Sequence, residues 1–375
     1  MIDRIKFRFE RMFGHLPVGT SPRSHFTKLK DDNPLLTNII SRQSGDYKTP
    51  VWILRFTSCE HRLCDVVFIE TEPGNLRLAS IDATPAALLR GHNGRVLKSQ
   101  QDLVLAMTRI DHLVGPLLEP QSRKRLFRLS YSTPSWTITT VELLAQFPDP
   151  GREFVEASHL CSCRNFIQKP LIVPGESTTF RSTEMNLKFY AKDLEVKRKN
   201  EIRDQLEPVT RIEITFLTNR TLEKGLGQRL NGRAVSTVPF DGILPTLQRS
   251  VGDRIVGALD DVEELVSEKL SRRARDIVAL HPSPATLHAA LHDDCEELGS
   301  SPTSRLRKEV FDRLAAECPF SLTQLFKRDV SFLTVDVPNP LVEYTFQTAI
   351  MTAGWPTEAD PEIAAAFESI HTRAK

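Results

Sequence analysis

Alternating apolar and polar positions dominate the first two-thirds of the chain and predict β-strands. Ile5, Phe7 and Phe9 alternate with basic residues, which is the period-two pattern of a strand with one buried face. Similar patterns predict further strands at residues 51–56, 65–70, 76–81, 138–147, 187–192 and 210–217. Residues 17–50 are mostly polar and include Asp-Asn-Pro, so we expect a loop with little regular structure there.

Two helices are expected between these strands. Thr84 and Pro85 carry the start signals of a short helix, and Gly91 carries the stop signal. The pair Ser99 and Asp102 resembles a capping box, followed to residue 118 by apolar residues at helical spacing.

The last third predicts helices. Apolar residues repeat every three or four positions over 255–270, and Ser301-Pro302 begins another helical pattern. Glycines and prolines cluster over 218–250, where we place a domain boundary. The expected fold is α+β: an antiparallel sheet with flanking helices in residues 1–230, followed by an acidic, mostly helical domain in residues 231–375.

The net charge changes sign near the same boundary. The chain of 375 residues has a net charge of +1. Residues 1–233 hold 35 Lys and Arg against 26 Asp and Glu, a net of +9, and residues 234–375 hold 14 against 22, a net of −8. A basic region can face a polyanion such as DNA, although chance drift of charge gives the same numbers. Basic clusters lie at 123–125, 197–199 and 272–273; each is also compatible with a solvated surface.

Composition excludes several classes of protein. No run of 18 apolar residues is present, so no transmembrane helix is expected, and the N-terminus lacks a signal-peptide core. Six cysteines suit a reducing cytoplasm, and we expect a cytoplasmic protein. No GxxxxGK[ST] loop occurs, so no nucleotide cofactor is expected.

Three of the predicted strands place chemically capable side chains opposite their apolar faces. By parity these are Glu142, then Tyr190 with Lys192, and then Glu213. Two carboxylates can hold Mg²⁺ or Mn²⁺, a tyrosine can act as a covalent nucleophile, and a lysine can stabilise charge on a phosphate. Parity alone favours the alternative of a solvated sheet face bearing cross-strand ion pairs.

Other residues could also take part in catalysis or metal binding, and each has an alternative explanation. His92 follows a helix end and can serve as a metal ligand or as a turn-stabilising histidine. The stretch His159-Leu160-Cys161-Ser162-Cys163 has tighter spacing than usual zinc motifs and lacks a second ligand pair. Tyr131, near the basic run 123–128, is a second candidate nucleophile.

Four ordered blocks resemble the filamentous-phage rolling-circle replication initiation proteins, the phage and plasmid gene II/X family. Residues 82–93, DATPAALLRGHN, resemble the family's S-P-A-K-x-L-x-G-H-N signature. Residues 137–142, TITTVE, resemble its I-S-R-I-D strand, and residues 187–195, LKFYAKDLE, resemble its Y-x-K-x-x-E strand. Residues 210–214, TRIEI, resemble its V-R-F-E strand. The blocks span roughly residues 60–230, and the acidic last third offers no matching motif.

The resemblance implies a rolling-circle DNA replication initiator with a nuclease fold. Tyr190 would nick one strand at the double-stranded origin, leaving a 5′-phosphotyrosine and a free 3′-OH, and would later reclose the displaced strand. Lys192 would assist Tyr190 or bind the phosphate, and Glu142, Glu213 and His92 would hold Mg²⁺ or Mn²⁺. Partners would be double- and single-stranded origin DNA, a host helicase and a host DNA polymerase, with no membrane. The residues expected to contact DNA are Arg123, Lys124, Arg125, Lys188, Lys197, Arg198, Lys199 and Arg211.

The chain departs from the family pattern at several positions. Glu142 stands where the family has Asp, and Thr140 stands where it has Arg. The paired-histidine motif of many other rolling-circle nickases is absent from the sequence. These departures fit a divergent branch or a protein that has lost nicking. Two other functions therefore stay open: an origin-binding replication or repressor protein that does not cleave DNA, and an oligomeric interaction protein built on the acidic helices.

Overall fold

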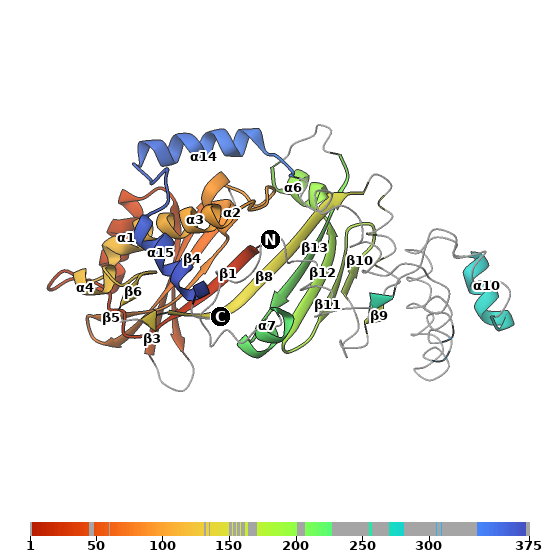
Figure 1. The fold of residues 1–375 in the computed structure, drawn as a ribbon, viewed down its shortest axis with the longest axis horizontal. Coiled ribbons are helices and arrows are strands. Elements are labelled where there is room, and N and C mark those ends of the chain that lie inside the picture. Colours follow the sequence, from red (N-terminus) through yellow and green to blue (C-terminus); the bar gives the residue numbers. More distant parts are fainter. Residues whose placement is uncertain are drawn as a thin grey trace. The chain divides into compact units, whose positions relative to one another are not determined.

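The computed structural model has a mixed α+β fold built on one ten-stranded antiparallel sheet (Figure 1). The strand order is β10-β11-β12-β13-β8-β1-β5-β4-β3-β2. The chain forms two compact units: the first comprises Met1–Leu143, Phe216–Ile243 and Pro338–Lys375, the second Leu144–Thr215 and Leu244–Val337. The structure describes residues 2–44, 49–59, 61–130, 133–134, 136–149, 152, 155, 158, 162–163, 171–200, 207–226, 255–256, 270–280, 305, 309 and 336–372. The predicted domain boundary at 230/231 and the helix predicted from Ser301 lie outside these residues.

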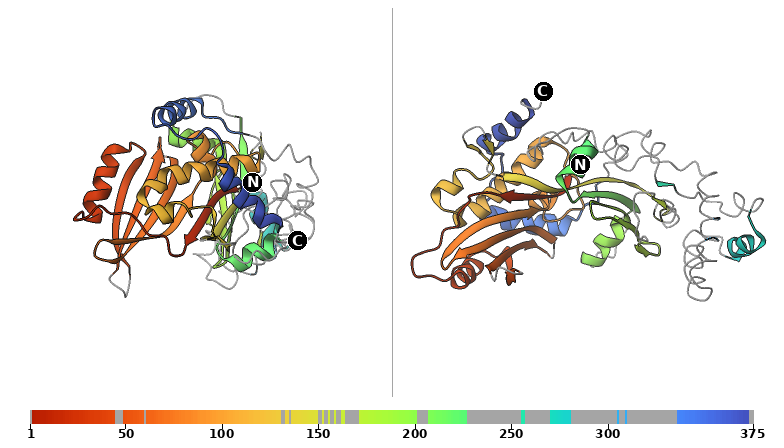
Figure 2. Two further views of the ribbon diagram at one scale, coloured as in Figure 1. Left: turned by 60° about the vertical axis from the view of Figure 1, so that its left-hand side comes forward. Right: turned by 90° about the horizontal axis from the view of Figure 1, so that it is seen from below.

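The first unit contains the strands predicted near the start of the chain. They are β1 (Ile2–Phe9), β3 (Thr49–Ser58), β4 (His61–Glu72) and β5 (Asn75–Ala83), with the first part of β8 (Trp136–Pro148). Neighbouring strands pair antiparallel, with Phe7 opposite both Ile81 and Ile138. Figure 2 shows these strands side by side from two further directions. Phe7 packs its ring edge-on against Phe127 and Trp136, at centroid distances of 4.9 and 5.4 Å, so this alternating strand anchors an aromatic core.

The prediction that residues 17–50 form a loop is wrong. Helix α1 (Pro22–Asp32) and strand β2 (Leu36–Ser44) occupy much of this stretch. Ser21 caps α1 by accepting a hydrogen bond from the Ser24 amide at 3.2 Å, and Phe26 anchors the helix 5.8 Å from the Phe68 ring. Because α1 buries so few residues and β2 pairs only with β3 at the sheet edge, neither carries a long apolar pattern.

The two predicted helices of the first unit are confirmed. Helix α2 (Pro85–Arg90) ends at Gly91, which adopts the left-handed conformation with φ of 81°. Helix α3 (Gln100–Val114) begins with the predicted capping box of Ser99 and Asp102. It continues as the 3₁₀ helix η2 (Gly115–Leu117), because Pro116 has no backbone N–H to extend the α-helical ladder. The short elements α4 (Pro120–Arg123), β6 (Leu129–Ser130), β7 (Thr133–Pro134) and α7 (Asn219–Leu226) complete this part.

Helices from the end of the chain complete the first unit. Helix α14 (Pro340–Thr352) packs against α2, and helix α15 (Pro361–Thr372) packs against α3 (Figure 1). Trp355 lies between these two helices, with its ring 6.0 Å from that of Phe346. The predicted helical character of the last third is thus confirmed for 340–352 and 361–372.

The second unit carries the other strands. These are β10 (Leu171–Val173), β11 (Ser177–Arg181), β12 (Met185–Ala191), β13 (Val209–Phe216) and the second part of β8. The helices are α6 (Lys192–Asn200) and α10 (Arg272–Leu280), and a two-stranded ladder joins β9 (Ser162–Cys163) to β14 (Ile255–Val256). Lys192 therefore begins a helix and does not end a strand as predicted. Likewise the helical pattern expected from residue 255 begins with a strand, because Ile255 and Val256 pair with β9.

Candidate functional site

Tyr190 and Glu213 lie on strands β12 and β13, which are neighbours in the sheet. The Tyr190 hydroxyl donates a hydrogen bond to Glu213 Oε1 at 2.5 Å. Tyr190 is 5% exposed, and every residue of β13 is buried. The polar face predicted from parity therefore exists. Tyr190 and Glu213 are buried on this face, whereas Lys188 of the same face is half-buried.

Arg211 and Gln146 extend this hydrogen-bonded chain. The Arg211 guanidinium donates through Nε to Gln146 Oε1 at 2.7 Å and lies 3.5 Å from Glu213 Oε1 through Nη1. Both Arg211 and Gln146 are fully buried. Arg211 therefore places a buried positive charge next to the Glu213 carboxylate, with which it interacts favourably.

Two lysines approach the Tyr190 ring. Lys188 Nζ lies 3.8 Å from the ring centroid and Lys192 Nζ lies 5.8 Å from it. The fully buried Lys192 also forms an ion pair of 2.6 Å with Glu195, one turn along α6. Both ammonium groups contribute positive charge beside the phenol, where a phosphate would also be attracted.

The start of α6 is held by a buried ion pair. Asp193 is fully buried and accepts two hydrogen bonds from Arg152, one of them at 2.9 Å. The same carboxylate accepts the Val209 amide at 3.0 Å, at the start of β13. Asp193 thus links the helix that carries Lys192 to the strand that carries Glu213.

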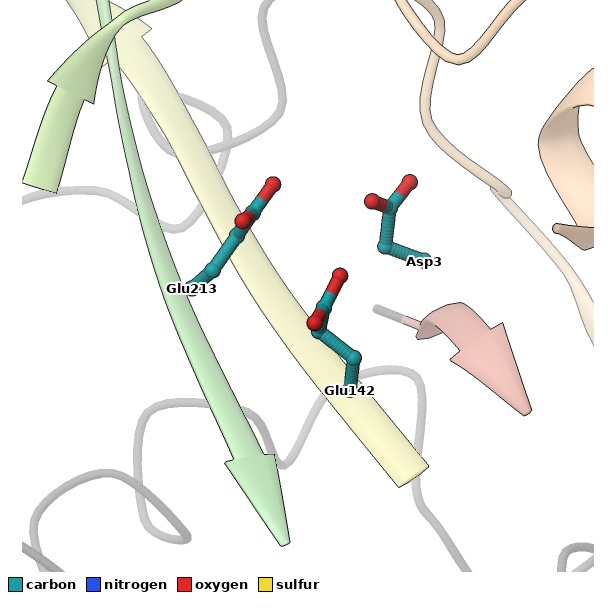
Figure 3. A group of neighbouring side chains, drawn as sticks. All are labelled: Asp3, Glu142 and Glu213. Atoms are coloured by element: carbon teal, nitrogen blue, oxygen red, sulfur yellow. The ribbon is translucent and has the colours of Figure 1, made fainter. Parts of the chain in front are cut away.

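Three carboxylates meet the distance requirement of a metal site. Asp3, Glu142 and Glu213 each offer an oxygen, and these oxygens lie within 4.8 Å of one another (Figure 3). The side chains come from β1, β8 and β13. An all-carboxylate set suits hard cations such as Mg²⁺ and Mn²⁺ and does not select soft metals. The group thus offers the ligand types and spacing of a possible metal site, and two of its members, Glu142 and Glu213, are residues that the sequence singled out as metal ligands.

Asp3 is the functional candidate that the sequence patterns missed. Simple alternation puts Asp3 on the same face as the apolar residues Ile5 and Phe7. The pairing of β1 with β8 shifts register between Ile2 and Arg4, so Asp3 is an extra residue in a bulge and parity breaks there. The Asn93 side chain also donates to Asp3 at 3.3 Å, which ties the family-like block at 82–93 to this carboxylate.

His92 is not part of the carboxylate group in the described structure. Its Nδ1 accepts the Gly94 amide at 3.0 Å, and its Nε2 contacts Glu343 Oε1 at 3.0 Å. Because Nδ1 accepts, the proton of the neutral ring lies on Nε2 and is donated to Glu343. These contacts match the alternative of a turn-stabilising histidine.

The residues expected to contact DNA differ in exposure. Arg123, Lys124 and Arg198 are exposed, and Arg198 contacts Glu176 at 2.5 Å. Arg125, Lys188 and Lys197 are half-buried, and Arg211 is fully buried. Tyr131, His159, Cys161 and the side chain of Lys199 lie outside the described residues.

Comparison with known proteins gives distant likeness to solved structures alone. No family model matches the chain, and no curated protein matches it. A solved structure that resembles it is a rolling circle replication initiator protein from Geobacillus stearothermophilus. The identity is 12% and the TM-score is 0.32, and the match covers 73% of this chain and 90% of that chain. In the part of the chain that the structure describes, no helix combines the length and apolarity needed to cross a membrane.

Proposed function

We propose that this protein is a rolling-circle DNA replication initiator, related to the filamentous-phage and plasmid initiators, that nicks one DNA strand through Tyr190. The observation that carries the proposal is the hydrogen bond from the Tyr190 hydroxyl to Glu213, a carboxylate that also belongs to the Asp3, Glu142 and Glu213 group. The ordered sequence blocks that resemble the initiator family contain the same tyrosine and two of the three carboxylates.

In the proposed reaction Tyr190 Oη attacks the scissile phosphorus. The Oη–P bond forms and the P–O3′ bond breaks, which leaves a 5′-phosphotyrosine and a 3′ oxygen that takes up a proton as the 3′-OH. Glu213 orients the hydroxyl and takes up its proton as Oη attacks, so the proton lost by Tyr190 balances the one gained by the 3′ oxygen. Arg211 lies beside Glu213. Lys188 and Lys192 supply positive charge next to the phenol, where the phosphate would gain negative charge in the transition state.

The carboxylate group fits a magnesium or manganese ion. Asp3, Glu142 and Glu213 would hold it, and the ion would polarise the scissile phosphate. Asp3 replaces His92 as the proposed third ligand, since His92 contacts Glu343 and Gly94.

The proposed partners follow from the reaction. The protein would bind double-stranded origin DNA before nicking and the displaced single strand afterwards. A host polymerase would extend the 3′-OH, and a host helicase would unwind the duplex because the chain has no GxxxxGK[ST] loop.

The test is formation of a covalent protein–DNA adduct. Purified protein is incubated with its own supercoiled replicon DNA and Mg²⁺ or Mn²⁺, and nicked circles are examined for protein joined to a 5′ end. We expect an adduct with the natural protein, none with Tyr190→Phe, and an undiminished amount with the control Tyr344→Phe, whose ring is 73% exposed on α14. An adduct that survives in Tyr190→Phe would move the nucleophile elsewhere, with Tyr131 as the next candidate.

A second function is favoured by the burial of Tyr190. A phenol that is 5% exposed has to become accessible before it can reach a phosphate, whereas binding of an origin without cleavage needs no such step. A non-cleaving replication or repressor protein would bind origin DNA in a salt-dependent manner and would form no adduct with either metal.

A further inference from the structure

The predicted basic cluster at residues 123–125 borders a cavity that the proposed nicking reaction does not use. The cavity has a volume of about 770 Å³ and belongs wholly to the first unit. Its uncharged lining residues are Gly115, Pro116, Leu118 and Pro120, and its charged lining residues are Asp111, Arg123, Lys124, Arg128 and Glu362. This volume is within the range of small-ligand sites and accommodates one phosphate with part of its sugar.

Arg128 is held in the cavity wall by three carboxylates. Its Nη1 donates to Asp111 at 2.9 Å, its Nη2 donates to Asp360 at 2.7 Å and its Nε donates to Glu362 at 2.9 Å. The three acidic partners differ in exposure: the Asp111 side chain is 15% exposed, that of Asp360 27% and that of Glu362 76%. Glu362 is therefore the partner that solvent and a competing anion reach most easily.

Besides its ion pair with Arg128, the Asp360 carboxylate also caps helix α15. The Asp360 carboxylate accepts the amides of Glu362 and Ile363 at the start of α15, at 2.8 and 3.2 Å. Its own amide donates to the Thr108 hydroxyl at 2.9 Å. Displacing Asp360 would uncap a helix, whereas displacing the Glu362 side chain breaks only one exposed ion pair.

Arg123 and Lys124 supply two further cations. Both side chains are exposed, and among the described residues no carboxylate lies within ion-pair distance of either. Arg123 acts electrostatically on Asp111 in the same lining. The two exposed cations attract a phosphate, whose oxygens accept hydrogen bonds from guanidinium and ammonium groups.

We propose that this cavity binds a phosphate of the DNA backbone. Arg123 and Lys124 are its primary ligands, and Arg128 becomes a third when the phosphate displaces Glu362 from Nε. The C-terminal helix α15 thereby lowers DNA affinity through one exposed carboxylate. The inference rests on the proposed function only in that the phosphate belongs to DNA, and its test involves no cleavage.

The experiment measures the affinity of the full chain for labelled single-stranded and duplex oligonucleotides over a range of salt concentrations. For the double variant Arg123→Ala with Lys124→Ala we expect affinity to fall about tenfold at low salt and the salt slope to fall by about one, the loss of roughly one phosphate contact. The matched control is Arg272→Ala with Arg273→Ala, which removes the same charge from an exposed site on α10. An equal loss in both double variants would overturn the proposal, because it would show an effect of net charge alone.

Removing the charge of Glu362 gives a second test, in which DNA affinity should rise. Glu362→Gln is expected to raise DNA affinity by about threefold, since it weakens the contact that holds Arg128 Nε. The control Glu10→Gln neutralises another exposed carboxylate of the same unit and should give a clearly smaller gain. Equal gains would contradict the proposed competition at Arg128.

Competition with small anions identifies the source of the phosphate. Inorganic phosphate and a mononucleotide are added at increasing concentration to the complex with DNA. Weak competition by both, together with a loss of DNA binding in the Arg123/Lys124 variant, supports the backbone site. Tight mononucleotide binding that disappears in this variant while DNA binding persists would overturn the assignment to DNA. Both binding measurements can be made whether or not the protein nicks DNA. They therefore test this inference independently of the proposed reaction.

Discussion

Gly91 lies directly against the side chain of Phe346, so that helix α14 closes over the end of helix α2 at a position that only glycine fits. A Cβ atom on Gly91 would come within 2.7 Å of Phe346 Cβ, and the φ of Gly91 is +81°. Both the backbone conformation and the close approach therefore require the absence of a side chain.

Replacing Gly91 should destabilise the first unit in two ways. For Gly91→Ala we expect a loss of about 2–5 kcal/mol in the free energy of unfolding, from the left-handed conformation and from overpacking against Phe346. The control is Gly74→Ala, because Gly74 has φ of +85° and a Cβ atom added there would meet no atom within 4 Å. This control should lose only about 1–2 kcal/mol. Urea denaturation measures both, and equal losses would refute the role of the Phe346 contact.

The attachment of α14 should depend on pH through Glu343. Burial raises the pKa of Glu343, but hydrogen bonds from Arg95 and His92 outweigh it and lower the pKa to about 2. The ordinary pKa of a glutamate is 4.5. The stabilisation that the ionised Glu343 carboxylate provides is therefore fully present above pH 4.5 and is lost as the pH falls through about 2. Fluorescence of Trp355, which packs on Phe346, should report the change.

Glu343→Gln should remove that part of the pH dependence and weaken the attachment already at neutral pH. The exposed Glu358 offers a matched control, and Glu358→Gln should keep the pH profile of the natural protein. A profile unchanged by Glu343→Gln would show that another acid controls the transition.

Arg152 should be essential for the stability of the second unit. Arg152→Ala leaves the fully buried Asp193 without its bidentate partner, and we expect a loss of about 3–5 kcal/mol in the free energy of unfolding. Arg198→Ala removes an exposed pair with Glu176 and should cost only about 0–1 kcal/mol. Thermal or chemical unfolding of both variants measures these losses. A small loss of unfolding free energy in Arg152→Ala would mean that other groups hold Asp193.

Metal binding should be detectable as stabilisation without DNA. If the carboxylate group holds an ion, Mg²⁺ or Mn²⁺ should raise the melting temperature of the natural protein, and a chelator should reverse the rise. Asp3→Asn should reduce this metal-dependent rise, because it removes one of three charged ligands. A rise of equal size in Asp3→Asn would place the bound metal at another site.

The sequence predicted elements whose signals are local. Strand β1 follows from strict alternation, and helices α2 and α3 follow from Pro85, Gly91 and the Ser99 capping box. Helix α1 was missed because its cap at Ser21 precedes a polar helix with one large apolar anchor, Phe26. The local pattern there contains too little apolar surface to distinguish a helix from a loop.

The candidate site was predicted where its residues lie on strands with a regular local pattern. Tyr190 and Glu213 occupy regular strands, so parity placed them on a common face, and the structure gives them a hydrogen bond. Asp3 was missed because the register of β1 against β8 shifts between Ile2 and Arg4, and simple alternation does not hold across such a shift. The partner of His92 is Glu343, 251 positions away, and no spacing rule connects residues so far apart.

The return of α14 and α15 to the first unit has a consequence for how the protein is made. Helix α2 is buried along nearly its whole length, and α14 covers part of it. During translation the ribosome finishes α2 some 250 residues before it produces α14, so the nascent chain carries an incompletely covered apolar surface for most of its synthesis. Products truncated before Pro340 should therefore require chaperones or aggregate, and the first unit matures only after α14 and α15 have left the ribosome.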